Sequence, residues 1–179
     1  MGLDMYLVAK KYLWSDKDKK IKEKIEKACG ISEPTSVSFE VMYWRKANAI
    51  HKWFVDNVQD GVDDCRESYV PLEKLKELLE IVTQVLNSVK LVDGKVGVGY
   101  SIVDGKMVEH FEDGKVVEDF GLAEDLLPTE SGFFFGGTDY DQYYYSDLKR
   151  TQEALQDLIT KVQTDDNYNC LDFYYHSSW

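Results

Sequence analysis

Apolar and polar residues alternate at both ends of the 179-residue chain. Residues 2–14, GLDMYLVAKKYLW, place Leu3, Met5 and Leu7 on one side of an extended backbone, and residues 170–179, CLDFYYHSSW, alternate again. Because successive side chains of a strand point to opposite faces, this period of two predicts a strand at each terminus. Two terminal strands with helical segments between them favour an α+β fold, a mostly antiparallel sheet packed by three or four helices.

Helical spacing and breaker residues predict the elements between the two termini. Ser15 and Gly30 bound a polar helix that we expect to be mostly solvated, and Pro71 opens an amphipathic helix that continues to about residue 89. A second strand is expected over residues 36–44, with Val37, Phe39 and Val41 facing one way. The other expected helices cover residues 44–58 and 138–162.

Residues 90–120 differ in character from the rest of the chain. Asp-Gly pairs begin at positions 93, 104 and 113, between runs of residues that favour strands. Asp-Gly is a strong hairpin signal because both residues of the tight turn need positive φ. We expect a β-meander of three or four strands, inserted into a single domain of residues 1–179. Such a meander can extend the main sheet or stand away from it as an arm.

The formal net charge of −12 argues against a polynucleotide or an anionic membrane as a partner. No apolar run approaches the ~18 residues of a membrane span. Three cysteines without CxxC spacing, and no preceding secretory signal, predict free thiols and a cytoplasmic location. The three histidines lie far apart and no dinucleotide or phosphate-loop fingerprint occurs, so no metal and no cofactor is expected. The oligomeric state stays open.

His51 is the most ambiguous residue of the expected 44–58 helix. A helical projection places it in the middle of an apolar arc, with Asn48 at the edge of that arc. A buried imidazole must form hydrogen bonds, since an unpaired buried polar group costs about 1–3 kcal/mol. His51 is therefore either a core histidine with satisfied nitrogens or, together with Asn48, part of a pocket wall.

Other polar residues form candidate ligand contacts with two interpretations each. Arg45 and Lys46 are expected in the first helical turn, where they bind an anion or pair with some of the 33 acidic residues. In the glycine-containing segment 128–145, Asp139 and Asp141 either bind a cation and transfer protons or cap the following helix. Thr129 and Ser131 complete the candidate ligand-binding set.

Exposed aromatic residues form a second candidate surface. The same helical projection places Trp53 opposite the apolar arc, and tyrosines cluster at 140–145. Large side chains that are both apolar and polar are enriched in protein interfaces. The candidate interface residues are Trp53, Tyr143, Tyr144 and Trp179.

Five phrases of the chain resemble an uncharacterised family of small bacteriophage and prophage proteins. They are GLDMYL, YWRKANAIHKWFV, GVDDC, LLPTESGFFFGGTDYD and the final SSW. The resemblance implies a phage-type accessory protein acting in a bacterial host cell, and it implies no activity. We therefore expect a non-enzymatic protein that binds a host protein or a small ligand. The most specific function of this kind is counter-defence against the host. The alternative is an enzyme for a nucleotide or phosphate ligand, with a pocket between helix 44–58 and loop 129–141.

Overall fold

The two ends of the chain lie side by side in the central sheet of the computed structural model, which describes residues 2–132 and 134–179. Asp4 pairs with Ser178 in antiparallel register, so the first and last strands are neighbours. The four-stranded sheet has the order β2–β1–β6–β3, and all its pairs are antiparallel. Its strands are β1 Asp4–Tyr12, β2 Ser36–Arg45, β3 Ser68–Val70 and β6 Asp172–Ser178. The α+β prediction is confirmed.

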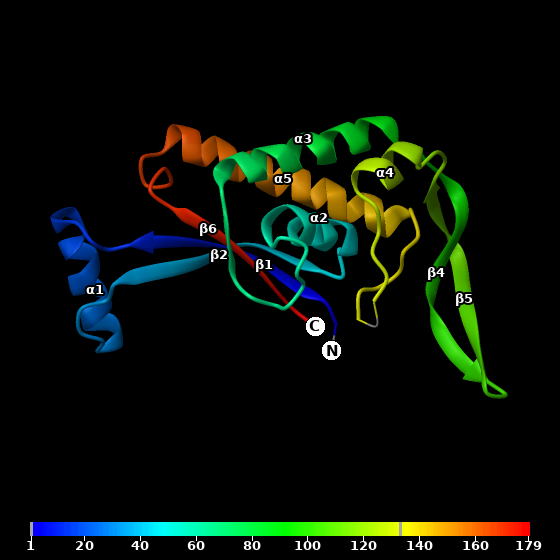
Figure 1. Cartoon of the computed structure of the whole chain (residues 1–179), viewed down its shortest axis with the longest axis horizontal. Coiled ribbons are helices and arrows are strands. Elements are labelled where there is room, and N and C mark those ends of the chain that lie inside the picture. The colour runs from blue at the N-terminus through cyan, green and yellow to red at the C-terminus, as the bar shows by residue number, and fades with distance from the viewer. Residues whose placement is uncertain (1, 133) are drawn as a thin grey trace.

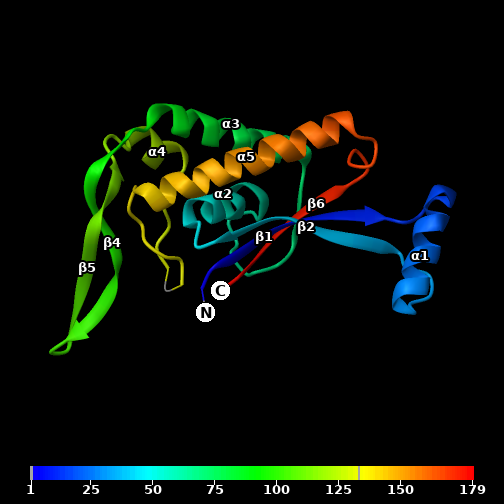
Figure 2. The same ribbon diagram turned by 180° about the vertical axis from the view of Figure 1, so that it is seen from behind.

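Three helices cover one face of this sheet (Figures 1 and 2). They are α2 Asn48–Val58, α3 Leu72–Ser88 and α5 Gln142–Thr164. Leu3, Met5 and Leu7 point toward them and are fully buried, as their alternation predicts. A buried hydrogen bond of 2.8 Å, from Trp44 Nε1 to Thr151 Oγ1, ties the sheet to α5. None of the described helices is long and apolar enough to cross a membrane.

The opposite face of the sheet carries polar aromatic side chains. Tyr6 stacks on His176 with ring centroids 4.8 Å apart, and it also contacts Tyr43. The hydroxyls of Tyr12 and Tyr174 lie 3.1 Å apart on the same face. Tyrosine suits a half-exposed sheet because its ring packs while its hydroxyl meets water. This face therefore accounts for part of the high tyrosine content.

β2 differs from the predicted strand through a β-bulge. Leu7 pairs with Met42 but the next residue, Val8, pairs with Glu40, so Val41 is the extra residue. Beyond the bulge Met42 and Trp44 reach the core, whereas Phe39 lies past its edge and is 52% exposed. Val37 and Phe39 pair with Lys11 and Ala9 and keep the predicted alternation, and Val41 packs against the core. The bulge then shifts the alternation by one residue, so that Met42 and Trp44 are the next residues to face the core.

The predicted polar helix forms α1 Lys19–Cys29, after a short 3₁₀ turn, Asp16–Asp18. Both the backbone N–H and the hydroxyl of Ser15 donate to the Asp18 carboxylate, and Gly30 ends the helix with φ of 68°. None of the α1 residues is buried, which confirms a solvated helix. α1 closes the projecting ends of β1 and β2, at one extremity of the molecule (Figure 1).

A single long hairpin replaces the expected three- or four-stranded meander. Its strands, β4 Leu91–Val103 and β5 Lys106–Val117, form a separate two-stranded sheet. Asp104 and Gly105 have φ of 51° and 75° and make its only turn within the described chain. The other two Asp-Gly pairs lie inside the strands, where Gly94 faces Gly114. A Cβ atom at Gly94 would lie 2.6 Å from Val116 Cγ2, so these glycines allow close side-chain packing and make no turn.

Backbone hydrogen bonds fix the base of the hairpin to the start of α5. The Val117 N–H donates to Tyr140 O at 2.9 Å, and the Lys115 N–H donates to the Gln142 side chain at 3.0 Å. The short helix α4 Gly121–Leu126 and the loop after it connect β5 to α5. The distal hairpin stands away from the main sheet as an arm, at the extremity opposite α1 (Figures 1 and 2).

Gly94→Ala is expected to destabilise the protein by about 1–3 kcal/mol, because the new methyl group overlaps the Val116 side chain. Urea unfolding monitored by circular dichroism measures the loss. A second substitution, Val116→Ala, removes the overlapping atoms and should recover part of the stability of the single variant. Equal stability of Gly94→Ala and the parent chain would contradict the packing described for the hairpin base.

Candidate functional site

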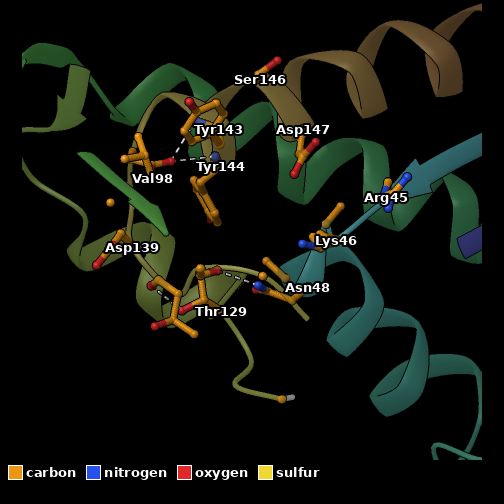
Figure 3. A pocket seen from close by; sticks show the side chains of 18 of the residues that line it. Arg45, Lys46, Asn48, Val98, Thr129, Asp139, Tyr143, Tyr144, Ser146 and Asp147 are labelled. Atoms are coloured by element: carbon orange, nitrogen blue, oxygen red, sulfur yellow. Dashed lines mark hydrogen bonds between the residues drawn. The ribbon is translucent and has the colours of Figure 1, made fainter. Parts of the chain in front are cut away.

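A cavity of about 1180 Å³ lies between the sheet, α5 and the hairpin (Figure 3). Residues 45–50 at the junction of β2 and α2 form one side of it. Parts of segment 129–139 and the first turns of α5 form two more sides. Residues 97–100, with Met107 and Glu109, add a side from the hairpin. A volume at or above the ~300–1,000 Å³ of small-molecule sites makes this cavity the leading candidate site.

Arg45 and Lys46 lie in the cavity wall but not in a helix. Arg45 is the last residue of β2, and Lys46 adopts a left-handed backbone with φ of 60° before α2 begins at Asn48. Their expected place in the first helical turn is therefore wrong, because β2 runs on to Arg45. Both side chains are exposed, and within the described residues neither forms an ion pair. The cavity wall thus has two adjacent cations that form no ion pair among the described residues (Figure 3).

The positive φ of Lys46 is held by its neighbours. Its N–H donates to Leu3 O at 2.8 Å, and its carbonyl accepts from the Asn48 N–H at 2.9 Å. Left-handed backbone at a residue other than glycine costs about 1–3 kcal/mol and is concentrated at functional sites. The strain bends the chain at this point, so that Arg45 and Lys46 both reach the cavity.

Asn48 fixes the loop that packs beside Lys46. Its side-chain amide donates to Phe135 O at 3.1 Å and to Gly137 O at 2.7 Å, and its Oδ1 accepts from the Glu130 N–H at 3.1 Å. All three contacts are with backbone, and Asn48 is 5% exposed. All hydrogen-bonding groups of the Asn48 side chain are therefore used to hold the loop. Asn48 shapes the cavity wall and has no amide group left for a ligand.

Segment 129–141 divides between cavity wall and structural support. Thr129 donates to Thr138 O at 2.9 Å, and Asp141 caps α5 by accepting from the N–H groups of Tyr143 and Tyr144. The capping interpretation is thus confirmed for Asp141, and burial raises the pKa of its carboxyl above the usual range. Exposed Asp139 lies in the wall, away from Arg45 and Lys46 (Figure 3), whereas Ser131 lies outside it.

Asp147 is the functional candidate that sequence reasoning missed. Its side chain lies in the cavity wall below α5 (Figure 3), and within the described residues it has no hydrogen bond or ion pair. Burial raises the pKa of its carboxyl to about 6, while the charge of Arg150, one turn later, opposes the rise. A sequence signal existed: Asp147 and Arg150 stand three residues apart beside the apolar position Leu148.

The hairpin contributes a wall that only the tertiary structure could reveal. A register shift between Gly97 and Gly99 turns Tyr100 and Glu109 toward the cavity. A side chain at Gly97 would crowd Glu109, since its Cβ would lie 3.0 Å from Oε1. The nearby charge of Glu109 raises the pKa of the Tyr100 hydroxyl. The hairpin side is thus acidic and aromatic.

His51 lies in the core and outside the cavity. It is 1% exposed, with Nδ1 2.7 Å from the Tyr175 hydroxyl and Nε2 3.0 Å from Asp63 Oδ2. Burial, helped by the charge of Asp63, raises the pKa of Tyr175, so the hydroxyl stays protonated and donates to Nδ1. Nε2 then donates to Asp63, which also accepts from Trp179 Nε1 at 3.1 Å. The core interpretation of His51 is the one that this geometry supports.

The candidate interface residues separate into two classes. Trp53 and Tyr144 are buried, at 5% and 7% exposed, so neither can meet a partner. Trp53 was misplaced because packing on both sides of α2 buries its supposed solvent face. Tyr143 and Trp179 are 55% and 46% exposed, and Tyr143 also lines the cavity.

No protein-family model, no curated protein and no solved structure matches the chain. The resemblance to phage proteins therefore stays a prediction from the quoted phrases. Among the described residues, no group of three or more histidine, cysteine, aspartate or glutamate side chains could hold a metal ion.

His51→Ala is expected to lower the free energy of unfolding by about 2–4 kcal/mol, because it leaves the buried Tyr175 hydroxyl without its acceptor and opens a void. Urea unfolding measures the loss. Asp56→Ala, on the exposed side of the same helix, removes only the surface pair with Lys52 and should cost under about 1 kcal/mol. A His51→Ala chain as stable as this control would show that the imidazole does not link α2 to β6.

Asp147→Asn is expected to change how stability depends on pH. The raised pKa means that the folded protein holds this proton more tightly than the unfolded chain does. Stability of the parent chain therefore falls as pH rises from about 4 to about 6, and the asparagine variant lacks this part of the fall. At pH 7 the variant should be more stable by on the order of 1–3 kcal/mol. Chemical unfolding at several pH values measures the difference, with the exposed Asp125→Asn as control, and parallel pH profiles for parent and variant would contradict a raised pKa.

Proposed function

We propose that the chain is a binding protein for a small anionic ligand, with the ligand's phosphate or carboxylate group held by Arg45 and Lys46. The observation that carries this proposal is the pair of adjacent cations at the cavity edge, without ion-pair partners among the described residues. An arginine guanidinium matches phosphate and carboxylate oxygens in a two-point contact, and a neighbouring lysine adds a point charge. An anion here would also relieve the repulsion between the two cations.

The strongly acidic composition does not oppose such a ligand at close range. Exposed charges are screened over about 8 Å at physiological ionic strength, so local cations decide the binding of a small ion. The net charge of −12 still disfavours long polyanions, whose charge extends well beyond the cavity. The proposal is thus a mononucleotide-sized or smaller ligand.

Asp147 makes the expected binding dependent on pH. Its carboxyl faces the same cavity as the cations and has a raised pKa, to about 6. Above that pH its negative charge repels an anion, and below it the repulsion disappears. Anion affinity should therefore increase as pH falls through about 6.

Asp147 also supports a second candidate, an enzyme acting on the same ligand. A carboxyl with a pKa near the working pH is suited to take or give a proton. Asp147 suits this role better than His51, because both nitrogens of His51 are engaged in the core. The phage resemblance would place either activity in a bacterial host.

Thermal unfolding with and without ligands tests the proposal. The panel is inorganic phosphate, pyrophosphate, a nucleoside monophosphate and a dicarboxylate. Each ligand is added in tenfold steps of concentration, at pH 5.5 and at pH 7.5. A ligand at about 100 times its dissociation constant adds about 2.7 kcal/mol of stability and raises the melting temperature by several degrees. The rise should be larger at the lower pH.

Arg45→Ala and Lys46→Ala should each abolish most of that rise, whereas Lys24→Ala, on solvated α1, should leave it unchanged. Because excluded salts stabilise every variant alike, the difference between variants isolates specific binding. A rise that survives in Arg45→Ala, or that disappears in Lys24→Ala, would refute a site at the end of β2.

A further inference from the structure

Lysines are concentrated on α1 and acidic residues on the hairpin, at the two ends of the long axis of the molecule. α1 carries five lysines and two glutamates, and within the described residues none of these lysines forms an ion pair. Residues 91–125, the hairpin with α4, carry nine acidic residues and three lysines. We name residues 14–39, which contain α1 and carry six lysines and five acidic residues, the α1 end, and residues 91–125 the hairpin end. They lie at opposite extremities (Figures 1 and 2).

Both ends also expose large apolar side chains. Ile102 and Met107 pair across the hairpin and are 80% and 74% exposed, and Tyr100 and Phe111, on the same face, are 62% and 53% exposed. The α1 end exposes Trp14 at 80%, Ile31 at 58% and Phe39 at 52%. Single exposed apolar residues are normal, but clusters on protruding elements mark interaction surfaces.

We propose that the hairpin end of one molecule binds the α1 end of a second copy of the same chain, in a head-to-tail contact. The lysines of α1 complement the acidic residues of the hairpin end, and each end offers apolar surface to the other. Two like ends, by contrast, would bring acidic surface against acidic surface or lysines against lysines. The contact would leave the other end of each molecule free, so that association can continue beyond a dimer.

The patches are small, so the association is expected in the weak, transient class. Its ionic part falls as salt is raised, because exposed charges are screened within a few ångströms at high ionic strength. Sedimentation velocity over a range of protein concentrations up to about 1 mM, the weak limit of specific binding, measures the association. The average mass should rise with concentration and should fall again on addition of salt.

Two end-specific variants distinguish the head-to-tail contact from other arrangements. Ile102→Ser with Met107→Ser disables the hairpin end, and Lys20→Glu with Lys24→Glu disables the α1 end. All four positions are accessible, so folding is expected to persist, and circular dichroism checks it. Each variant alone should remain monomeric. An equimolar mixture should form dimers and nothing larger, because only one productive contact remains. Lys76→Glu, a charge reversal at a partly exposed position of α3, is the control and should associate like the parent.

Three results would overturn the proposal. They are a parent chain that stays monomeric up to about 1 mM, an α1-end variant that still associates like the parent, and a mixture that stays monomeric. The second result would instead indicate pairing between hairpins.

Discussion

Three hydrogen bonds from the buried side chain of Asn48 hold the candidate site together. They join the first residue of α2 to the backbone of residues 130, 135 and 137, in a loop whose described residues have no regular secondary structure of their own. A satisfied buried hydrogen bond contributes about 1 kcal/mol, but an orphaned amide in the same place would cost more. The loop is therefore fixed where it forms a cavity wall. One turn later, His51 joins the same helix to β6 and Asp63.

The sequence alone predicted those helices and strands whose apolar residues recur with one regular spacing. The alternation of Leu3, Met5 and Leu7 predicted β1, and leucine spacing predicted α3, because both patterns are set by local geometry. Features that depend on distant packing were not predictable. β2 continues to Arg45, so the following helix starts at residue 48 and not at 44, and Arg45 and Lys46 lie outside it. Two of the Asp-Gly pairs were expected to form turns. They lie inside the strands instead, and their glycines leave space for valine side chains on the opposite strand.

The candidate site was located in part. The cavity includes parts of the two segments, 44–58 and 129–141, between which a pocket was expected, but one of its carboxyls, Asp147, and its hairpin wall were missed. Asp147 was hidden because a charged residue in an amphipathic helix is expected to face water, and only tertiary burial changes that. His51 was recognised as inward-facing, and its hydrogen-bond partners lie 12 and 124 residues away in the chain.

The two proposals meet at the hairpin. Tyr100 and Met107 line the cavity and also belong to the exposed face proposed to contact a second molecule. A ligand that changes the packing of these side chains would alter self-association, and self-association would alter ligand affinity by the same factor. Because of the register shift at Gly97–Gly99, the same face of the hairpin both lines the cavity and carries the exposed apolar side chains.

The most direct test of the anion site is a titration of the isotopically labelled protein with inorganic phosphate, followed through its backbone amide signals by nuclear magnetic resonance. The account predicts saturable shifts concentrated at residues 45–48 and 147–150, which flank the cavity on β2, α2 and α5. Shifts confined to the lysines of α1, where positive charge is most abundant, would contradict it, and so would the absence of any saturable change.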